Sequence, residues 1–229
     1  MSSKKHPWKI CDRGETYVRG HKKTINGHEY SWSGHCRRVK HKKQILNKDE
    51  IIEISKKFKK QSLKLPKDYN FKAKNGSKYD RLIAGWVHYW QEVLGKDANI
   101  TTDFVKILMM SESSFNPQAK AITHDHPGRA IGLMQITSYT HKLIQPESKE
   151  LKDHAFKVSL NDLKDPNINI SVGVRWLFRK RQISKHFLKV EPTMLQLAEE
   201  YKGIRGDKSA KAEQQRKAFL KYKKKYEVN

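Results

Sequence analysis

The stretch SESSFNPQAKAITHDHPGRAIGLMQI, residues 111–136, joins the end of an apolar helix to a loop rich in glycine, proline and histidine. Val105, Leu108 and Glu112 are separated by three and four residues, which places all three on one helix face. Glu112 is therefore predicted to lie on a buried face, where the charged form of a carboxyl group is disfavoured. This indicates a proton donor, although a glutamate near a helix C-terminus is more often solvated or salt-bridged.

The composition describes a basic chain with room for one sizeable domain and a small appendage. It has 229 residues, of which 36% are hydrophobic, and 48 Lys+Arg against 24 Asp+Glu give a formal net charge of +24. Such a charge predicts a polyanionic partner, and nucleic acid, anionic membrane and bacterial cell wall are the candidates. Most of the cations are lysines, which favours attraction to a surface over the reading of base edges.

The sequence divides into two regions near residue 46. Residues 1–45 contain both cysteines and a turn signal, INGHE, between two Gly-His pairs, which predicts a small β-type module with a hairpin. Residues 46–229 have the periodicity of helices, with N-caps at or beside Asn47, Thr101 and Asp165, and we expect no strand among them. The fold class is therefore mainly α, a helical domain with a small N-terminal β-type module.

The two cysteines leave three kinds of site open. Cys11 and Cys36, together with His21 and His35, have the ligand types of a zinc site, but the paired spacings that structural zinc sites favour are absent. A disulfide between the cysteines, or two free thiols, is the alternative. We predict no metal and no cofactor.

Four motifs in order make the chain similar to the soluble lytic transglycosylases and, more distantly, to the goose-type lysozymes. They are Glu112-Ser113 followed by FNPQA, then GLMQI at residues 132–136, DP..NI..G at residues 165–173 and AEEYKG at residues 198–203. The last is incomplete, because Lys202 stands where asparagine is usual. The resemblance covers about residues 78–205 and implies a lysozyme-like domain that cleaves peptidoglycan.

The resemblance also implies roles for individual residues. Glu112 would be the single acid/base that protonates the leaving glycosidic oxygen, and Ser113 would bind substrate near the scissile bond unless it only caps the helix end. Gly132 would let the backbone approach the sugar closely. Met134 and Gln135 would line the cleft, with the amide holding an N-acetyl or hydroxyl group.

Two further residues complete the predicted site. Tyr201 would direct its hydroxyl at Glu112 or the sugar, although the residue taken alone would be assigned to the core. Asp125 lies in the loop where goose-type lysozymes carry an acid that positions water, whereas their second acidic position is Thr137 here. His124 and His126 beside Asp125 are expected to be solvated and not metal ligands.

The predicted activity is cleavage of the MurNAc-β-1,4-GlcNAc bond with Glu112 as general acid/base. Hydrolysis, as in a muramidase, is favoured slightly over formation of 1,6-anhydroMurNAc ends by a lytic transglycosylase. Glu112→Gln is expected to abolish cleavage while stability holds or rises slightly. The alternatives from other classes are an inactive glycan-binding module and a basic nucleic-acid-binding protein, for which no helix-turn-helix, RRM or zinc-finger signature is found.

Peptidoglycan glycan strands are the expected partner, with no specific nucleic acid. The chain has no run of 18 apolar residues and no apolar segment after its charged N-terminus, so we expect neither a membrane span nor a signal peptide. An enzyme of this kind would reach the periplasm or cell wall through a secretion system, a phage or lysis machinery, as an antibacterial toxin for example. A delivery component and an immunity protein would be further partners, and residues 1–45 a targeting or delivery element.

Overall fold

The computed structural model describes residues 10–39, 43–69, 71, 76–95, 99–123 and 128–225 of the chain. The α-helices in this part are α1 (Lys48–Lys57), α2 (Asp80–Leu94), α3 (Thr102–Ser113), α4 (Ser138–Ile144), α5 (Pro166–Leu188), α6 (Met194–Lys202) and α7 (Ala210–Lys225). The strands are β1 (Glu15–Val18), β2 (His21–Ile25), β3 (His28–Trp32), β4 (His35–Arg38), β5 (Ile45–Asn47), β6 (Lys120–Thr123), β7 (Gly128–Ile131), β8 (Ile136–Thr137) and β9 (Ala155–Lys157). Short 3₁₀ turns lie at Phe58–Lys60 and Asp162–Lys164.

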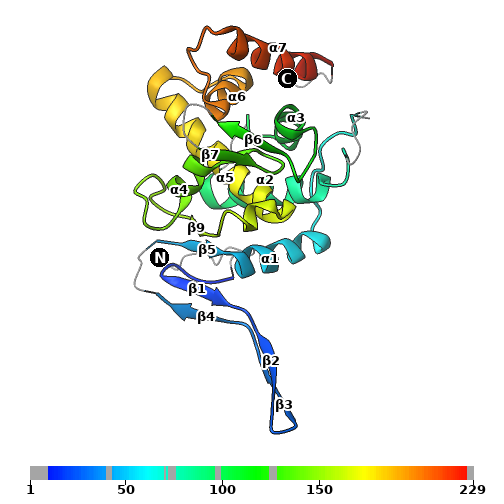
Figure 1. Ribbon diagram of the computed structural model, residues 1–229, viewed down its shortest axis with the longest axis vertical. Helices are drawn as coiled ribbons and strands as arrows, with labels where there is room; N and C mark the ends of the chain where they lie inside the picture. Colours follow the sequence, from blue (N-terminus) through cyan, green and yellow to red (C-terminus); the bar gives the residue numbers. More distant parts are fainter. Residues whose placement is uncertain are drawn as a thin grey trace.

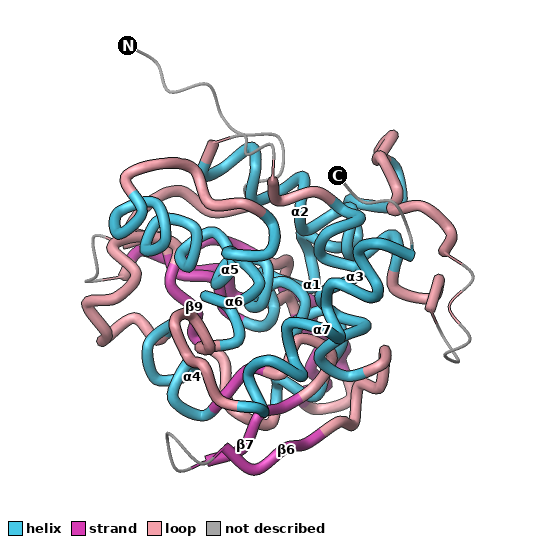
Figure 2. The backbone as a smooth tube through the Cα atoms, turned by 90° about the horizontal axis from the view of Figure 1, so that it is seen from above, coloured by secondary structure: helices cyan, strands magenta, loops and turns pink. Residues whose placement is uncertain are grey.

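Helix α5 runs through the centre of the helical body and contacts α1, α2 and α6 (Figures 1 and 2). Trp86 and Trp90 of α2 are completely buried, and the indole N–H of Trp90 donates to the Ser171 carbonyl of α5 at 3.0 Å. Helix α7 lies against α3, where the ring of Phe219 packs edge-on against Phe104. The predicted mainly α fold is confirmed.

The helix boundaries follow the capping residues. The Asn47 side chain caps α1, the Thr101 side chain caps α3, and Asp165 caps α5 with Pro166 as its first residue. Helix α2 ends at Gly95, as its sequence indicates. No helix among the described residues is long and apolar enough to cross a membrane.

The expectation that no strand follows residue 45 is wrong. Strands β6, β7 and β8 form a small antiparallel sheet, and β5 pairs with β9 in parallel. Each of these strands has two to four residues, so none is long enough to show the alternating pattern by which a strand is recognised in a sequence. The β6–β7–β8 sheet is important for function because it leads into and out of the GLMQI motif.

The N-terminal module is a long two-part hairpin, as predicted. Strand β1 pairs with β4 near the body, and β2 pairs with β3 beyond it (Figure 1). Asn26 and Gly27 form the turn between β2 and β3 and both have positive φ, which suits a two-residue hairpin turn. Every residue of β2 and β3 is exposed, and Figure 1 shows these strands projecting away from the helices.

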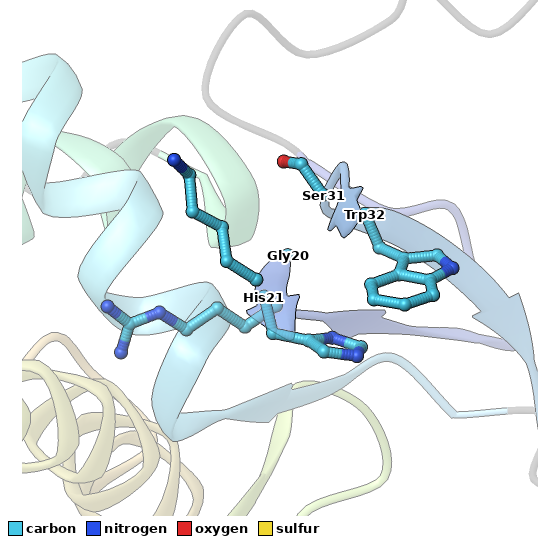
Figure 3. A pocket seen from close by; sticks show the side chains of 6 residues that line it. Gly20, His21, Ser31 and Trp32 are labelled. Carbon is cyan, nitrogen blue, oxygen red and sulfur yellow. The ribbon is translucent and has the colours of Figure 1, made fainter. Parts of the chain in front are cut away.

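A hollow of about 630 Å³ lies on this hairpin, at the junction between its two parts. Arg19, Lys22 and Ser31 line it together with His21 and Trp32, whose rings stack with centroids 4.8 Å apart (Figure 3). The Trp32 side chain is 43% exposed. The hairpin therefore presents an aromatic surface flanked by cations.

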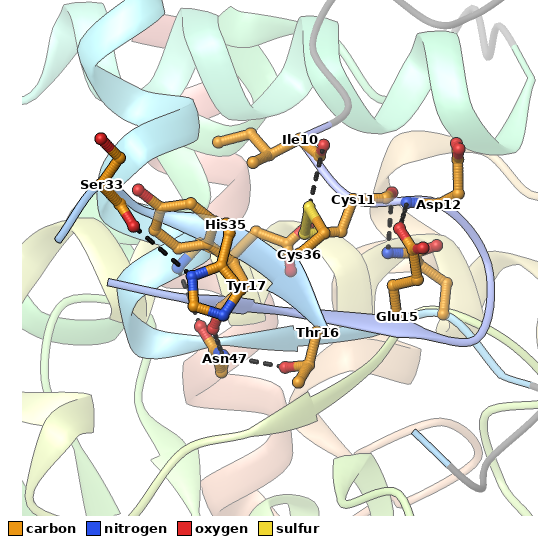
Figure 4. The surroundings of a disulfide bond; sticks show 12 residues. Ile10, Cys11, Asp12, Glu15, Thr16, Tyr17, Ser33, His35, Cys36 and Asn47 are labelled. Atoms are coloured by element: carbon orange, nitrogen blue, oxygen red, sulfur yellow. Dashed lines mark hydrogen bonds between the residues drawn. A yellow bond between two sulfur atoms is a disulfide. The ribbon is translucent and has the colours of Figure 1, made fainter. Parts of the chain in front are cut away.

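Of the three alternatives for the cysteines, the structure has the disulfide between Cys11 and Cys36 (Figure 4). It joins Cys11, in the segment before β1, to Cys36 within β4. Cross-linking two positions 25 residues apart reduces the conformational freedom of the unfolded chain. The disulfide and the β1–β4 ladder therefore hold the base of the hairpin together.

Asn47 connects this base to the helical body (Figure 4). Its side-chain oxygen accepts the Glu50 N–H at 2.9 Å and so caps α1, while its amide nitrogen donates to Thr16 Oγ1 at 2.9 Å and to the Tyr17 carbonyl at 2.6 Å. One amide thereby starts a helix and fastens β1. A domain boundary at residues 45–46 remains a prediction.

Candidate active site

Glu112 lies in the last turn of α3, where the chain leaves the core. After Ser113 the backbone turns sharply, because Ser114 and Phe115 both have left-handed conformations, with φ of 51° and 61°. The Phe115 ring is 1% exposed and anchors the segment after the turn. The Glu112 carboxyl group is thus held at the edge of the core, with its side chain 13% exposed.

The partner of Glu112 is Lys202, the last residue of α6. Lys202 Nζ lies 2.5 Å from Glu112 Oε1, and the lysine side chain is 8% exposed. The sequence predicts a buried helix face that disfavours the charged form, and the structure adds a cation against the carboxyl group, as in the salt-bridged alternative. Periodicity within one helix cannot reveal a cation that a distant helix supplies.

Ser113 connects the end of α3 to the GLMQI motif. Its hydroxyl lies 2.8 Å from the Leu133 carbonyl, to which it donates, and 3.3 Å from the Met109 carbonyl one turn back in its own helix. The side chain therefore has a structural role in positioning Glu112 against the motif. Substrate contact by Ser113 remains a prediction.

Gly132 begins the GLMQI motif in a conformation that other residues rarely adopt, with φ of +77°. A Cβ atom built there would lie 2.4 Å from the Asn169 side-chain nitrogen and 2.9 Å from the Leu163 carbonyl oxygen. The close approach that requires glycine is thus to Asn169 of α5. The close approach to the sugar that the resemblance implies for Gly132 remains a prediction.

Asn169 is completely buried and makes three side-chain hydrogen bonds, one to Met134 of the motif, one to Ile131 directly before it and one to Leu163. Its amide nitrogen donates to the Ile131 carbonyl at 2.9 Å and to the Leu163 carbonyl at 2.8 Å. Its side-chain oxygen accepts the backbone N–H of Met134 at 2.8 Å. This role of Asn169 was not predicted from the sequence, although the residue's place in the DP..NI..G pattern was a signal for it.

The Met134 side chain lies in the core and does not line an open cleft, since its exposed fraction is 0%. It packs on Gly173, one turn of α5 after Asn169, where an added Cβ would come within 2.4 Å of the Met134 sulfur. The Met134 carbonyl accepts a hydrogen bond from the Tyr201 hydroxyl at 2.8 Å. Met134 is therefore held by α5 on one side and by α6 on the other.

Tyr201 lies next to Lys202 on α6 and close to Glu112. Burial raises its pKa well above the ordinary value of 10.0, and the negative charge of Glu112 raises it further. The phenol thus stays protonated and acts as a hydrogen-bond donor. Its donated hydrogen bond goes to the Met134 carbonyl of the motif, and contact of the hydroxyl with Glu112 or the sugar remains a prediction.

The Gln135 side chain folds back onto the loop. Its amide nitrogen donates to the Gly132 carbonyl at 2.8 Å and to the Ala119 carbonyl at 3.2 Å, and its own φ is positive at 48°. With both N–H groups engaged, the amide oxygen is the part of this side chain suited to a sugar hydroxyl or N–H. Binding of an N-acetyl group by Gln135 remains a prediction.

Comparison with known proteins assigns the family. Residues 89–221 match the family model of the transglycosylase SLT domain, and this is more than half of the chain. The chain belongs to the transglycosylase SLT family. No curated protein and no solved structure matches it.

The SLT match begins within α2 and ends within α7, so it includes α3, the GLMQI loop, α5 and α6. This SLT protein is therefore a peptidoglycan-cleaving enzyme of the lysozyme-like type. The N-terminal hairpin and α1 precede the matched region. The resemblance inferred from the sequence is confirmed, and the roles of its individual residues are proposals.

Two positions bear on which SLT reaction takes place. Asp125, with His124 and His126, lies outside the described residues, so its part in the site stays a prediction. Thr137 is the N-cap of α4, and its hydroxyl oxygen accepts the Thr140 N–H at 3.0 Å. Thr137 therefore serves as a helix cap in this structure.

Proposed function

We propose that the protein is a lytic transglycosylase, with Glu112 acting first as the acid and then as the base. The observation that carries this proposal is the position of Glu112 at the end of α3, facing Tyr201 and the motif that Asn169 fixes. Glu112 is also the one acidic residue in the Glu-Ser and GLMQI motifs. A single carboxyl group is sufficient for this reaction, because the second nucleophile belongs to the substrate.

In the first step, Glu112 gives its proton to the oxygen that joins C1 of MurNAc to C4 of GlcNAc, and the C1–O bond breaks. The GlcNAc side leaves with a free 4-hydroxyl, and Glu112 is left as a carboxylate. In the second step, the 6-hydroxyl oxygen of the same MurNAc attacks C1, and its proton passes to Glu112. The product is a 1,6-anhydroMurNAc end, and the enzyme has regained its proton.

The neighbouring carboxylates of α6 are engaged elsewhere, which supports a single acid/base. Glu199 pairs with Arg216 of α7. Glu200 pairs with Lys180 at 3.2 Å and with Arg205 at 3.1 Å. Neither side chain is therefore positioned as a partner for Glu112.

Hydrolysis by a muramidase is the second candidate, and Asp125 is the residue that would favour it. Asp125 would hold a water molecule on the opposite face of the sugar from Glu112, as in inverting enzymes. The loop that contains it connects β6 to β7 next to the GLMQI motif. Under this alternative the products have reducing MurNAc ends.

Mass spectrometry of muropeptides released from purified sacculi tests the proposal. The expected products of the wild type carry anhydroMurNAc and are one water molecule lighter than reducing muropeptides. Glu112→Gln should lose about 10²-fold or more of the activity, because the amide is far too weak an acid to protonate the leaving oxygen. Asp125→Asn should keep nearly full activity. Reducing ends from the wild type, together with an inactive Asp125→Asn, would establish hydrolysis instead.

We further propose that the N-terminal hairpin is a wall-targeting or delivery element. Its exposed Trp32 and the cations Arg19 and Lys22 suit contact with an anionic polymer, and the net charge of +24 supports the same kind of partner. Delivery by a secretion system, phage or lysis machinery, and protection of the producer by an immunity protein, belong to this proposal.

A further inference from the structure

The ion pair between Lys202 and Glu112 bears directly on the proton transfer proposed above. Both side chains are largely removed from water, with exposed fractions of 8% and 13%, and Nζ lies 2.5 Å from Oε1. A cation at this distance favours the ionised form of a carboxyl group. That is the opposite of the form that protonates a leaving oxygen.

The surroundings of Glu112 explain why a cation fits at this point. The carboxyl group is in the last turn of α3, where the unpaired carbonyl groups of the helix disfavour a negative charge. Within the part of the chain that the structure describes, the ionisable groups that face it are the Lys202 ammonium and the Tyr201 hydroxyl, both from α6. The GLMQI loop contributes backbone groups, and α7 packs on α3 with the apolar side chain of Phe219.

We propose that Lys202 is a positioning residue that holds Glu112 as a carboxylate in the substrate-free enzyme. This inference rests on the proposed role of Glu112 as the acid/base. Lys202 then stabilises the state between the two steps, in which Glu112 must accept the proton of the 6-hydroxyl. It penalises the protonated state that begins the reaction, and so restricts efficient cleavage to lower pH.

The test is the pH dependence of kcat/KM on soluble glycan strands, which reports the free enzyme. In Lys202→Asn and Lys202→Met, the alkaline limb of the profile should move to higher pH, because the charge that favours the carboxylate is gone. Lys202→Arg keeps the cation and should keep the wild-type limb. Lys189→Asn is the control for loss of one positive charge, since Lys189 is exposed and its left-handed backbone suits asparagine.

A second measurement does not depend on turnover. The ¹³C carboxyl resonance of Glu112, assigned by its absence in Glu112→Gln, should titrate at lower pH in the wild type than in either neutral variant. Lys202→Arg should follow the wild type. A merely structural role for Lys202 would change stability or activity without moving this titration.

The outcomes separate this inference from the proposed function. Superimposable pH profiles and titrations of the wild type and the neutral variants, with Glu112→Gln inactive, would overturn the role of Lys202 and leave Glu112 as the acid/base. Near-normal turnover by folded Glu112→Gln would overturn the proposed function itself. A displaced limb in both neutral variants, with Lys202→Arg and Lys189→Asn unchanged, supports both.

Discussion

The side-chain oxygen of Asn169 accepts the backbone N–H of Met134 at 2.8 Å, and neither residue is exposed to solvent. This bond joins the central helix α5 to the middle of the GLMQI loop. Tyr201 reaches the Met134 carbonyl from the other side. The loop next to Glu112 is thus held through its backbone, so its geometry depends on two helices far along the chain.

Asn169→Asp should weaken this arrangement. The aspartate keeps an acceptor for the Met134 N–H but loses both N–H donors and places a carboxylate against the Ile131 and Leu163 carbonyls. We expect the free energy of unfolding to fall by about 2–4 kcal/mol, as for a buried polar network left unsatisfied. Urea denaturation and sacculus clearing measure the two effects. Asn161→Asp is the exposed control and should change neither.

The Glu112–Lys202 pair changes the stability expected for Glu112→Gln. From the sequence, removal of a buried ionisable group would leave stability unchanged or slightly higher, but the structure leaves the Lys202 ammonium without its counter-charge. We expect Glu112→Gln to be less stable by about 1–3 kcal/mol. The double variant with Lys202→Met should recover part of that loss.

A double-mutant cycle by urea denaturation measures this coupling. Lys22 and Glu29, an ion pair on the exposed hairpin with side chains 69% and 60% exposed, form the matched control. Their coupling energy should be close to zero, because solvent screens surface pairs. Equal coupling in the two cycles would contradict a special environment for Glu112.

Shortening the hairpin should separate wall binding from catalysis. Replacing residues 21–32 with a tight turn removes β2 and β3 but keeps the β1–β4 ladder and the Cys11–Cys36 disulfide. We expect unchanged cleavage of soluble glycan strands and weaker retention on sacculi. Sedimentation with sacculi, compared with retention on DNA over a range of salt, measures the binding. Loss of all activity in a folded protein would show that the hairpin serves the chemistry.

Replacement of residues 21–32 is a better test of the hairpin than deletion of residues 1–45. Ile45 is 4% exposed and pairs with Ala155 through the β5–β9 ladder, so that deletion would remove part of the core. Trp32→Ala with Tyr30→Ala is a milder variant, since both rings are exposed. It should reproduce the binding defect if the aromatic surface makes the contact.

High pH should destabilise the protein through Tyr201. Because the pKa of Tyr201 in the folded protein is raised above 10.0, its contribution is fully present below about pH 10 and is lost as the pH rises through the folded pKa. Tyr201→Phe should therefore show a shallower loss of unfolding free energy above pH 10. At neutral pH it should cost about 1 kcal/mol, for the hydrogen bond to Met134.

Urea denaturation across this pH range provides the measurement. Tyr30→Phe is the matched control, because Tyr30 is 47% exposed and its replacement should leave the pH dependence as in the wild type. If Tyr201→Phe loses stability above pH 10 as steeply as the wild type, other groups cause the alkaline destabilisation.

Much of the helical architecture could be predicted from local signals. Asn47, Thr101 and Asp165 cap helices because their side chains accept backbone N–H groups a few residues away. The turn at Asn26-Gly27 is equally local, since both residues tolerate positive φ. Such signals involve residues that are close together in the chain, so they can be recognised without knowledge of the tertiary structure.

The motifs were sufficient to recognise the family. The family in turn drew attention to Glu112 and implied peptidoglycan cleavage. The short strands β5 to β9 could not be predicted, because two to four residues are too few to show an alternating pattern, and β5 in addition pairs with β9 far along the chain. The choice of the disulfide over free thiols or zinc also required knowledge of which residues the β1–β4 ladder brings together.

The contacts that define the site were decided by tertiary structure alone. Lys202 is 90 residues from Glu112, and Asn169 is 35 residues from Met134. Neither contact can therefore be inferred from the spacing of residues within one helix or loop. The sequence did determine which side chains were available, including a lysine where its family usually has asparagine. Only the packing of α6 against the end of α3 made that lysine the counter-ion of the glutamate, because electrostatic partners are set by distance in space.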